Sequence, residues 1–411
     1  MAEPPQPVKT ERLVESRTFT LRLTDSQADE LRRIGRALAS QKQWWGTIKD
    51  ADTPDRSVVR CERISDDQHI VRVSDAIGAI GLGDLQLIVE PKIPLRHVLY
   101  LLVESNQFPR SLYERSSLGV DNNFFSLVAQ WFVHTCEVLL RHGLVSDYGR
   151  VRADLPCARG RIQTVKTAQS IAAGRPSIRC QFDQFGEDTS LNRVLKAAAV
   201  RLLGMPGSPV GLRARCRRIL YRLSDIGDLR TGDLVVTPDA LSRRYRDAYP
   251  LALAIIASTG LDIEAGDKST WTFLFRTPEA VEEGLRNSLR THLEPAWKVQ
   301  KTAKILLGDR NRSLNPDLVF GDNAAVGDVK YQLNPDGEIK RGHLYQVTTF
   351  ATGYHAKKAT VIAFGACETG EELHVGTVQV NGFNWNFDDA TPEQAAKRLA
   401  DTIRSWLGGC R

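Results

Sequence analysis

The sequence lacks the cysteine and histidine patterns that mark disulfide-stapled and zinc-binding proteins. Its seven cysteines are odd in number and scattered, no Cys-x-x-Cys pair occurs, and its eight histidines show no zinc-like spacing. The longest apolar stretch, 127–140, contains His134 and Glu137 and is too short for a membrane span. The first ten residues are polar and rich in proline, with no apolar run behind them, so no secretory signal is predicted. A reducing cytoplasm is the expected location.

A phosphate-binding loop is also missing. Such a loop needs the pattern Gly-x-x-x-x-Gly-Lys-Ser/Thr. The nearest passage is 260–269, where Asp267 separates Gly266 from Lys268. The spacing fails, and an acid would sit where a phosphate has to bind. Any nucleotide-driven motor that works with this chain is therefore expected on another polypeptide.

Apolar and charged residues occur in proportions typical of a globular protein. They make up 42% and 25% of the 411 residues, a length that allows two or three domains. The formal net charge of +6 is unevenly placed, because 141–250 holds 20 Lys and Arg against 10 Asp and Glu. Arginine forks match phosphate geometry, so a DNA backbone is one expected partner, and a plain solvated helix face is the alternative. The clustered arginines, our candidate DNA-binding residues, are Arg213, Arg215, Arg217, Arg218, Arg243, Arg244 and Arg246.

Periodicity and composition predict an α+β multidomain protein. We expect a disordered leader at 1–14 and an N-terminal mixed or mostly β domain at 15–96. A basic, helical middle domain follows at 97–260, and an α/β domain at 261–411. No internal repeat is found.

Local patterns place the main elements of these domains. Capping residues and a 3.6-residue apolar period predict helices over 24–39, 124–144, 191–203, 210–223, 238–258, 277–293, 343–356 and 391–407. Alternation and turn residues predict strands at 18–23, 57–64, 69–73, twice within 76–93, and at 297–307, 360–364 and 374–380. The polar stretch 159–181 is expected to be a loop or irregular hairpin, and 368–372 an acidic loop.

Two short apolar runs near the C-terminus carry acids and a lysine. The runs are 315–320 and 325–331, with Gly-Asp-Asn between them. Because strand side chains alternate between faces, Asp328 and Lys330 share one face, and Asp317 joins them if the turn forms a hairpin. Two carboxylates and one ammonium at one spot suit a hard cation, a phosphate and an attacking water. The simpler alternative is a surface hairpin with solvated charges.

Magnesium is the expected cofactor, with manganese as the alternative. Mg²⁺ prefers oxygen ligands and keeps several waters, so Asp317 and Asp328 can hold it and leave positions open for phosphate and water. The metal lowers the pKa of the water and neutralises charge that develops on phosphorus. Lys330, beside the water, can orient it or help to remove its proton.

The pattern of Pro316-Asp317 followed by Asp328-Val329-Lys330 resembles the PD-(D/E)xK nuclease superfamily. Other segments resemble the McrC family, the nuclease subunits of modification-dependent restriction systems. The resemblance therefore implies a C-terminal PD-(D/E)xK nuclease core within 261–411. The further segments that carry it, in the expected order, are 79–82, 85–93, 159–162, 190–196 and 245–253.

The superfamily resemblance also implies helper residues. It places an acid on the helix before the motif, and Glu282 matches that position as a third metal ligand, although a plain surface carboxylate is the alternative. Gln346, on the helix after the lysine, matches a position that assists the site in related nucleases. Tyr331 could contact a phosphate, but a surface position is the simpler interpretation.

The family resemblance implies a Mg²⁺-dependent DNA endonuclease subunit of a McrBC-like, type IV restriction complex. Its substrate would be double-stranded DNA that carries modified cytosine, such as 5-methylcytosine. A McrB-like AAA+ GTPase hexamer would recognise and translocate the DNA, and the N-terminal domain here would dock that partner and stimulate its hydrolysis. Two alternatives stay open. The chain could be a non-catalytic activator or adaptor of an AAA+ ring, or a stand-alone DNA repair nuclease.

Overall fold

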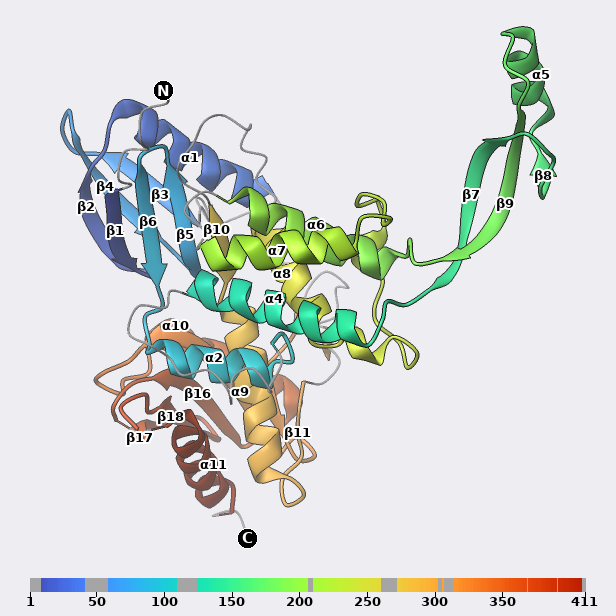
Figure 1. The fold of residues 1–411 in the computed structure, drawn as a ribbon. Coiled ribbons are helices and arrows are strands. Elements are labelled where there is room, and N and C mark those ends of the chain that lie inside the picture. The colour runs from blue at the N-terminus through green and yellow to red at the C-terminus, as the bar shows by residue number, and fades with distance from the viewer. Residues whose placement is uncertain are drawn as a thin grey trace. The chain divides into compact units, whose positions relative to one another are not determined.

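The computed structural model divides the chain into two compact units (Figure 1). The first combines Met1–Phe125 with Leu261–Arg411, and the second is Ser126–Gly260. The passage 260–269, compared above with a phosphate loop, lies outside the described residues. No helix in the described part of the chain is long and apolar enough to cross a membrane. The described residues are 9–40, 58–108, 124–205, 210–259, 272–301, 305–306, 313–367, 369–389 and 391–408.

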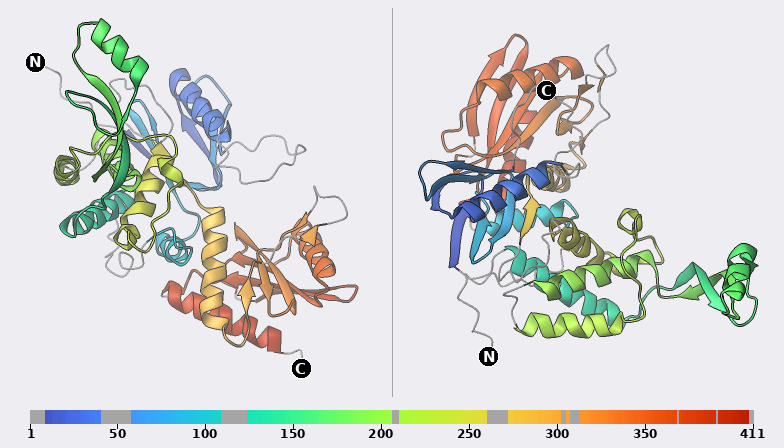
Figure 2. Two further views of the ribbon diagram at one scale, coloured as in Figure 1. Left: turned by 90° about the vertical axis from the view of Figure 1, so that its right-hand side faces the viewer. Right: turned by 90° about the horizontal axis from the view of Figure 1, so that it is seen from above.

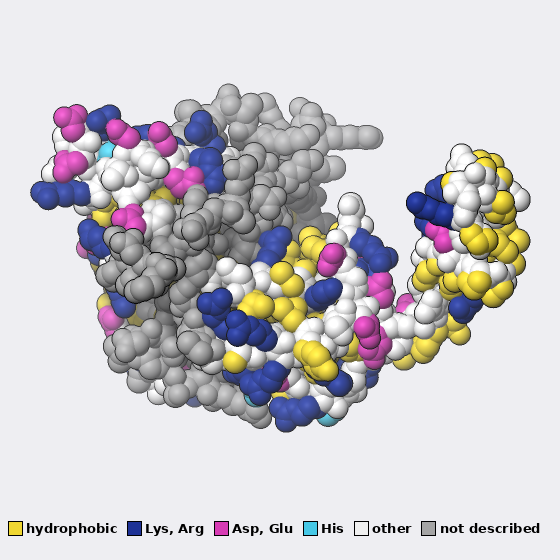
Figure 3. Space-filling model, turned by 45° about the horizontal axis from the view of Figure 1, so that its top comes forward, with side chains coloured by type: hydrophobic (Ala, Val, Ile, Leu, Met, Phe, Trp, Pro, Cys, Tyr) yellow, Lys and Arg dark blue, Asp and Glu magenta, His cyan; other side chains and the backbone are white. Residues whose placement is uncertain are grey.

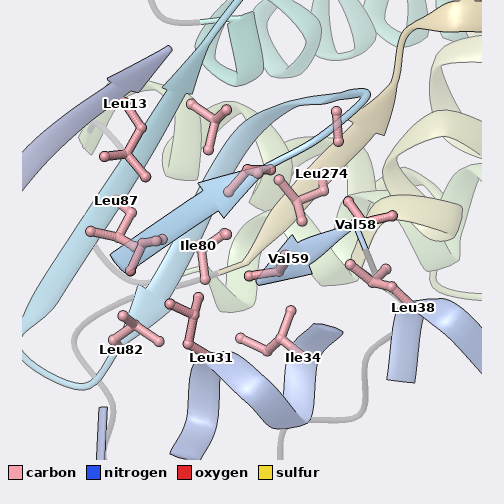
Figure 4. Close-up of a cluster of buried hydrophobic side chains, with 14 of the residues drawn as sticks. Leu13, Leu31, Ile34, Leu38, Val58, Val59, Ile80, Leu82, Leu87 and Leu274 are labelled. Carbon is pink, nitrogen blue, oxygen red and sulfur yellow. The ribbon is translucent and has the colours of Figure 1, made fainter. Parts of the chain in front are cut away.

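Two small sheets and a helix build the N-terminal part of the first unit. Helix α1 (Asp25–Ser40) begins with the predicted cap, since the Gln27 amide donates to Thr24 Oγ1 at 3.3 Å and the Thr24 amide to Gln27 Oε1 at 3.0 Å. Apolar side chains of α1, among them Leu31 and Ile34, meet both sheets in one buried core (Figure 4). The strands are β1 (Lys9–Val14), β6 (Leu85–Glu90), β5 (Ala76–Leu82) and β10 (Phe273–Arg276) in one sheet, and β2 (Thr18–Arg22), β4 (Gln68–Val73) and β3 (Val59–Arg63) in the other, each in spatial order.

Strand β1 corrects the prediction of a disordered leader over 1–14. It pairs in parallel with β6, from Lys9 opposite Leu85 to Val14 opposite Glu90. Leu13 on this strand is buried in the core, which gives the segment an apolar anchor that its polar neighbours conceal in the sequence. Residues 9–14 therefore belong to the sheet.

A six-stranded mixed sheet forms the C-terminal part of the first unit. The central pairs β15–β16 and β16–β18 are parallel and the remaining pairs are antiparallel. The predicted strand at 374–380 is wrong in its bounds, because it spans the turn between two strands, and the predicted acidic loop at 368–372 is largely strand. In spatial order the strands are β11 (Val299–Gln300), β14 (Leu318–Phe320), β15 (Ala325–Leu333), β16 (Lys358–Phe364), β18 (Val378–Trp385) and β17 (Thr369–Val375). The predicted strand at 297–307 is split, since β12 (Ile305–Leu306) pairs instead with β13 (Ser313–Leu314).

Helices cover both faces of this sheet. Helix α10 (Arg341–Tyr354) packs apolar side chains on the face to which Val326 of β15 points. Helix α11 (Pro392–Gly408) lies on the other face, where Trp406 contacts Phe320 and Phe383. Both helices, and α9 (Pro278–Leu293), were predicted from their periodicity.

Helix α2 (Leu95–Glu104) ties the N-terminal part of the first unit to the C-terminal part. It packs so closely on α9 that a Cβ on Gly284 would lie 2.0 Å from the carbonyl oxygen of Leu101. On the same helix, His97 Nδ1 accepts a hydrogen bond of 2.9 Å from the Trp385 indole. Glycine is needed at position 284 because no side chain fits between the two backbones.

The second unit is a group of packed helices that carries a long β arm. The helices match the predictions except that α8 begins about ten residues late, after a short 3-10 turn at Arg243–Tyr245. Tyr245 is fully buried, and its hydroxyl hydrogen-bonds to Asn192 and to the backbone of Val145. The helices are α4 (Phe124–Arg141, which begins in the first unit), α6 (Ser190–Gly204), α7 (Val210–Arg222) and α8 (Ala248–Thr259).

The β arm is the largest departure from the predicted fold of this region. Strands β7 (Asp147–Leu155) and β9 (Ile178–Gly186) pair over nine residues and run away from the helices of their own unit (Figure 2). Between them, β8 (Arg161–Ile162) and helix α5 (Thr164–Ala172) occupy the stretch predicted as a loop or irregular hairpin. Hydrophobic side chains cover much of the arm (Figure 3). Those with large exposed surfaces are Tyr148, Ile162, Val165, Ile171 and Phe185.

Candidate active site

The two motif strands form the predicted hairpin and bring the acids and the lysine together. In the antiparallel pair of β14 with β15, Leu318 lies opposite Gly327. Asp317 directly precedes β14, so the same register places it opposite Asp328. Asp328 and Lys330 are two residues apart on β15 and therefore share a face.

Short contacts fix this group of side chains. Lys330 Nζ lies 2.5 Å from Asp328 Oδ2 in an ion pair. The backbone amide of Val329 donates to Asp317 Oδ2 at 3.0 Å, so the aspartate before one strand binds the backbone of the next. Gln346 of α10 donates from Nε2 to Asp328 Oδ1 at 3.4 Å, a long and weak hydrogen bond. The structure therefore brings these four side chains together.

Burial and neighbouring charges raise the pKa of two carboxyl groups in this cluster. Burial, and secondarily the charge of Asp317, raises the pKa of Asp328 to about 7, whereas Lys330 opposes the shift. Burial also raises the pKa of Glu282 to about 8, with Asp317 as the next contributor and Lys301 opposing. Glu282, half-buried on α9, is thus close enough to sense the charges of the motif aspartates. Asp317 and Asp328 are 8% and 3% exposed, so water does little to screen that repulsion.

The donor set fits a hard divalent cation. All three acids offer oxygen atoms, which Mg²⁺ prefers, and their mutual repulsion is the condition that a cation relieves. Mg²⁺ commonly uses only one or two carboxylates. This matters because no three His, Cys, Asp or Glu side chains among the described residues converge as a complete metal-holding group. Asp317 and Asp328 are the pair that would hold the ion, and Glu282 as a third ligand stays a prediction.

Two basic residues near Asp317 were missed in the sequence. Lys301 Nζ lies 3.8 Å from Asp317 Oδ1, and Arg286 of α9 donates to the Asp317 carbonyl at 3.1 Å. Lys301 directly follows β11, and the pairing of Val299 with Phe320 brings it beside Asp317. The position of Lys301 next to Asp317 can be recognised only once β11 is known to pair with β14.

A buried ion cluster joins the N-terminal sheet to the elements that carry the site. Glu15 is fully buried and lies 4.0 Å from Lys92 Nζ, which stands 4.0 Å over the ring of Tyr331. Thr277 occupies the N-cap position of α9, where the sequence predicted the helix to begin, but its side chain makes no capping hydrogen bond. Its hydroxyl donates a hydrogen bond to Glu15 instead. Tyr331 is buried and not at the surface, contrary to the simpler interpretation above. The cluster therefore contacts both β15, next to Lys330, and the first turn of α9.

The candidate DNA-binding arginines differ in their surroundings. Arg215 makes a two-pronged ion pair with Glu137 of α4, at 2.9 and 2.7 Å. Its neighbours on α7 are exposed and point to different sides of the helix. Arg243, Arg244 and Arg246 are exposed at the 3-10 turn before α8. Lys and Arg side chains recur over the second unit (Figure 3).

Comparisons with known proteins agree with these features. A solved Thermococcus gammatolerans assembly, described as a refined half-complex of McrB AAA+ hexamers with bound McrC, contains a chain that matches 96% of this chain and 100% of its own length. The TM-score is 0.67 at 15% identity, which shows a shared, mixed α/β fold. The type IV methyl-directed restriction enzyme EcoKMcrBC of Escherichia coli (strain K12) is 24% identical over 141 residues, 34% of this chain. The match spans 40% of that relative's length.

A family model covers a larger part of the chain than that pairwise match. It aligns with residues 71–364, which include strands β5 and β6, the second unit and both motif strands. The chain belongs to the family described as the McrBC 5-methylcytosine restriction system component.

Proposed function

We propose that this chain is the Mg²⁺-dependent endonuclease subunit of its restriction system, with a PD-(D/E)xK core over the C-terminal sheet. The observation that carries the proposal is the convergence of Asp317, Asp328 and Lys330 at the junction of two motif strands. A hairpin that only met solvent would gain nothing from burying two carboxylates side by side. Such a cost is usual where a charged ligand completes the site.

The metal would bind at Asp317 and Asp328, and Mn²⁺ is the alternative ion. When bound, it supplies positive charge that activates a water and offsets the charge on phosphorus. Burial raises the pKa of Glu282 to about 8, and positive charge beside this side chain would favour its ionised form.

Lys330 has a role of its own at the phosphodiester. Its ammonium is paired with Asp328 at 2.5 Å. A charged ammonium donates hydrogen bonds and accepts none, so Lys330 is suited to orient a water or hold a phosphate oxygen before any proton moves. Gln346 would keep the Asp328 carboxylate in position through its amide.

The partner in this proposal is a McrB-like AAA+ GTPase hexamer, and the substrate is double-stranded DNA with modified cytosine. The N-terminal sheets are one candidate docking surface. The arm is a second candidate, because it exposes apolar side chains such as Tyr148, Val165 and Phe185. Exposed apolar patches of this kind mark surfaces that bind a partner. The Thermococcus assembly, in which McrB hexamers carry bound McrC, supports an association of this kind.

Separation of function tests the proposal. Asp328→Ala, reconstituted with the McrB-like partner on methylated plasmid with Mg²⁺, should abolish cleavage and leave stimulation of the partner's GTP hydrolysis intact. Asp322→Ala is the matched control, since Asp322 is an exposed acid on the turn of the same hairpin. Loss of both activities in a folded Asp328→Ala protein, or full cleavage by it, would contradict the proposed division of labour.

A further inference from the structure

Helices α4 and α7 of the second unit line an open, basic pocket of about 580 Å³. Four arginines and one glutamate supply its charge, so its formal charge is three positive units. Two apolar side chains complete the lining. The lining residues are Glu137, Leu140, Arg141, Arg215, Arg218, Ile219 and Arg222.

One arginine of the pocket is held rigidly by the only acid. Glu137 receives both prongs of Arg215, and hydrogen bonding with Arg215 lowers the pKa of Glu137. Arg141 is anchored through its Nε to the Glu137 carbonyl at 3.3 Å. The glutamate is therefore occupied with positioning arginines and leaves most of the positive charge available.

The other arginines of the pocket keep their donors for an outside ligand. Arg218 and Arg222 are exposed, and neither makes a hydrogen bond or ion pair with any residue that the structure describes. On α7, Arg215, Arg218 and Arg222 follow the i, i+3, i+7 spacing of one helix face. The three span about 10 Å along the helix axis at about 1.5 Å per residue. A row of this length matches a chain of phosphates better than a single anion.

We infer that this pocket, the α4–α7 groove, binds the phosphate backbone of duplex DNA. The inference rests on the proposed function, because a DNA-cutting subunit has to hold its substrate. It narrows the arginines singled out from the sequence and adds Arg141 and Arg222 to them. Guanidinium groups form paired hydrogen bonds with phosphate oxygens, and each neutralised phosphate releases counterions.

The same helix provides a matched control. Arg213 and Arg217 are also exposed on α7, but they lie about 160° around the axis from Arg215 at 100° per residue. Replacing them removes the same charge from the same helix and leaves the groove intact. If DNA binds only through general electrostatic attraction, both pairs of substitutions should lower the affinity equally. If DNA contacts the groove, only the pair that lines the groove should lower it strongly.

The test compares Arg218→Ala/Arg222→Ala with Arg213→Ala/Arg217→Ala in the full chain. Fluorescence anisotropy of a labelled duplex, in EDTA to prevent cleavage, gives the affinity between about 50 and 200 mM salt. The groove variant should bind about tenfold more weakly. Its plot of log affinity against log salt concentration should be less steep by about 1.8, because each of two lost phosphate contacts accounts for about 0.9. The control variant should show less than half of this loss in affinity and less than half of this change in slope.

Three outcomes would overturn the inference: equal losses in both variants, unchanged binding by the groove variant, or no duplex binding by the wild type. Unchanged binding would point to an acidic protein surface as the ligand of the groove. Plasmid cleavage is measured in parallel on the wild type. If the wild type cleaves plasmid but the groove test fails, the proposed DNA-binding groove is refuted and the proposed nuclease activity is not.

Discussion

Lys92→Met should destabilise the first unit by about 3–5 kcal/mol at pH 8, the usual effect of removing one partner of a buried ion pair. Lys92 Nζ lies 4.0 Å from Glu15 Oε1 and 3.9 Å from Asp75 Oδ1, with the Lys92 and Glu15 side chains 7% and 0% exposed. Two unit charges 4 Å apart attract by about 4 kcal/mol at an effective dielectric constant of about 20, which agrees with that range. The contact with the Tyr331 ring adds to the loss.

Proton uptake by Glu15 gives this prediction a pH signature. Burial already raises the pKa of Glu15, and Lys92 is the strongest influence that lowers it. In Lys92→Met the folded pKa rises further above the unfolded value, so the folded state holds more protons than the unfolded one. Stability then increases as the pH falls. The deficit relative to wild type should therefore shrink as the pH falls toward the ordinary glutamate pKa of about 4.3.

The double variant Glu15→Gln/Lys92→Met distinguishes charge pairing from simple packing. Because both charges are removed, it should recover most of the loss, with a remaining cost of about 1.5 kcal/mol or less. Urea unfolding followed by tryptophan fluorescence is a suitable assay, since six of the seven tryptophans belong to the first unit. A double variant as unstable as the sum of the single ones, or a Lys92→Met deficit that ignores pH, would refute this reasoning.

Three further predictions concern the first unit. Burial, and secondarily Arg96, lowers the pKa of His97 to about 4. As the pH falls, the unfolded histidine takes up a proton before the folded one does, so the free energy of unfolding should fall by about 2–3 kcal/mol from pH 6.5 to 4. Urea titrations of His97→Gln should show less of that fall. Gly284→Ala should cost about 1–3 kcal/mol or more, since its Cβ would meet the α2 backbone at 2.0 Å, and an unchanged melting temperature would show that the helices stand further apart. Gln346→Ala should slow single-turnover cleavage about tenfold by freeing the Asp328 carboxylate, and an unaltered rate would remove Gln346 from the site.

The motif hairpin could be predicted because its signal is local. A period of two assigns Asp328 and Lys330 to one face, and the short turn sets the register that brings Asp317 opposite. The helices of the C-terminal part could also be predicted, because their apolar side chains recur at helical spacing. Family resemblance then supplied Glu282 and Gln346, whose proximity to Asp328 no local pattern shows.

Features that depend on distant segments could not be predicted. Glu15 directly follows β1 and Lys92 lies just after β6, and only the fold shows that these distant residues share a buried site with Tyr331. The arm was missed for a different reason. Within β7 and β9 only Cys180 is buried, so these strands lack the fully buried apolar face that marks a strand in sequence.

The dependence of single-turnover DNA cleavage on Mg²⁺ tests the central claim most directly. Wild-type chain with its McrB-like partner should cut methylated duplex at a rate that saturates with Mg²⁺ and vanishes in EDTA. Asp328→Asn, which keeps the shape of the side chain and removes its charge, should lose at least about 100-fold in that rate. Cleavage that persists in EDTA, or an Asp328→Asn rate within a few-fold of wild type, would contradict the account.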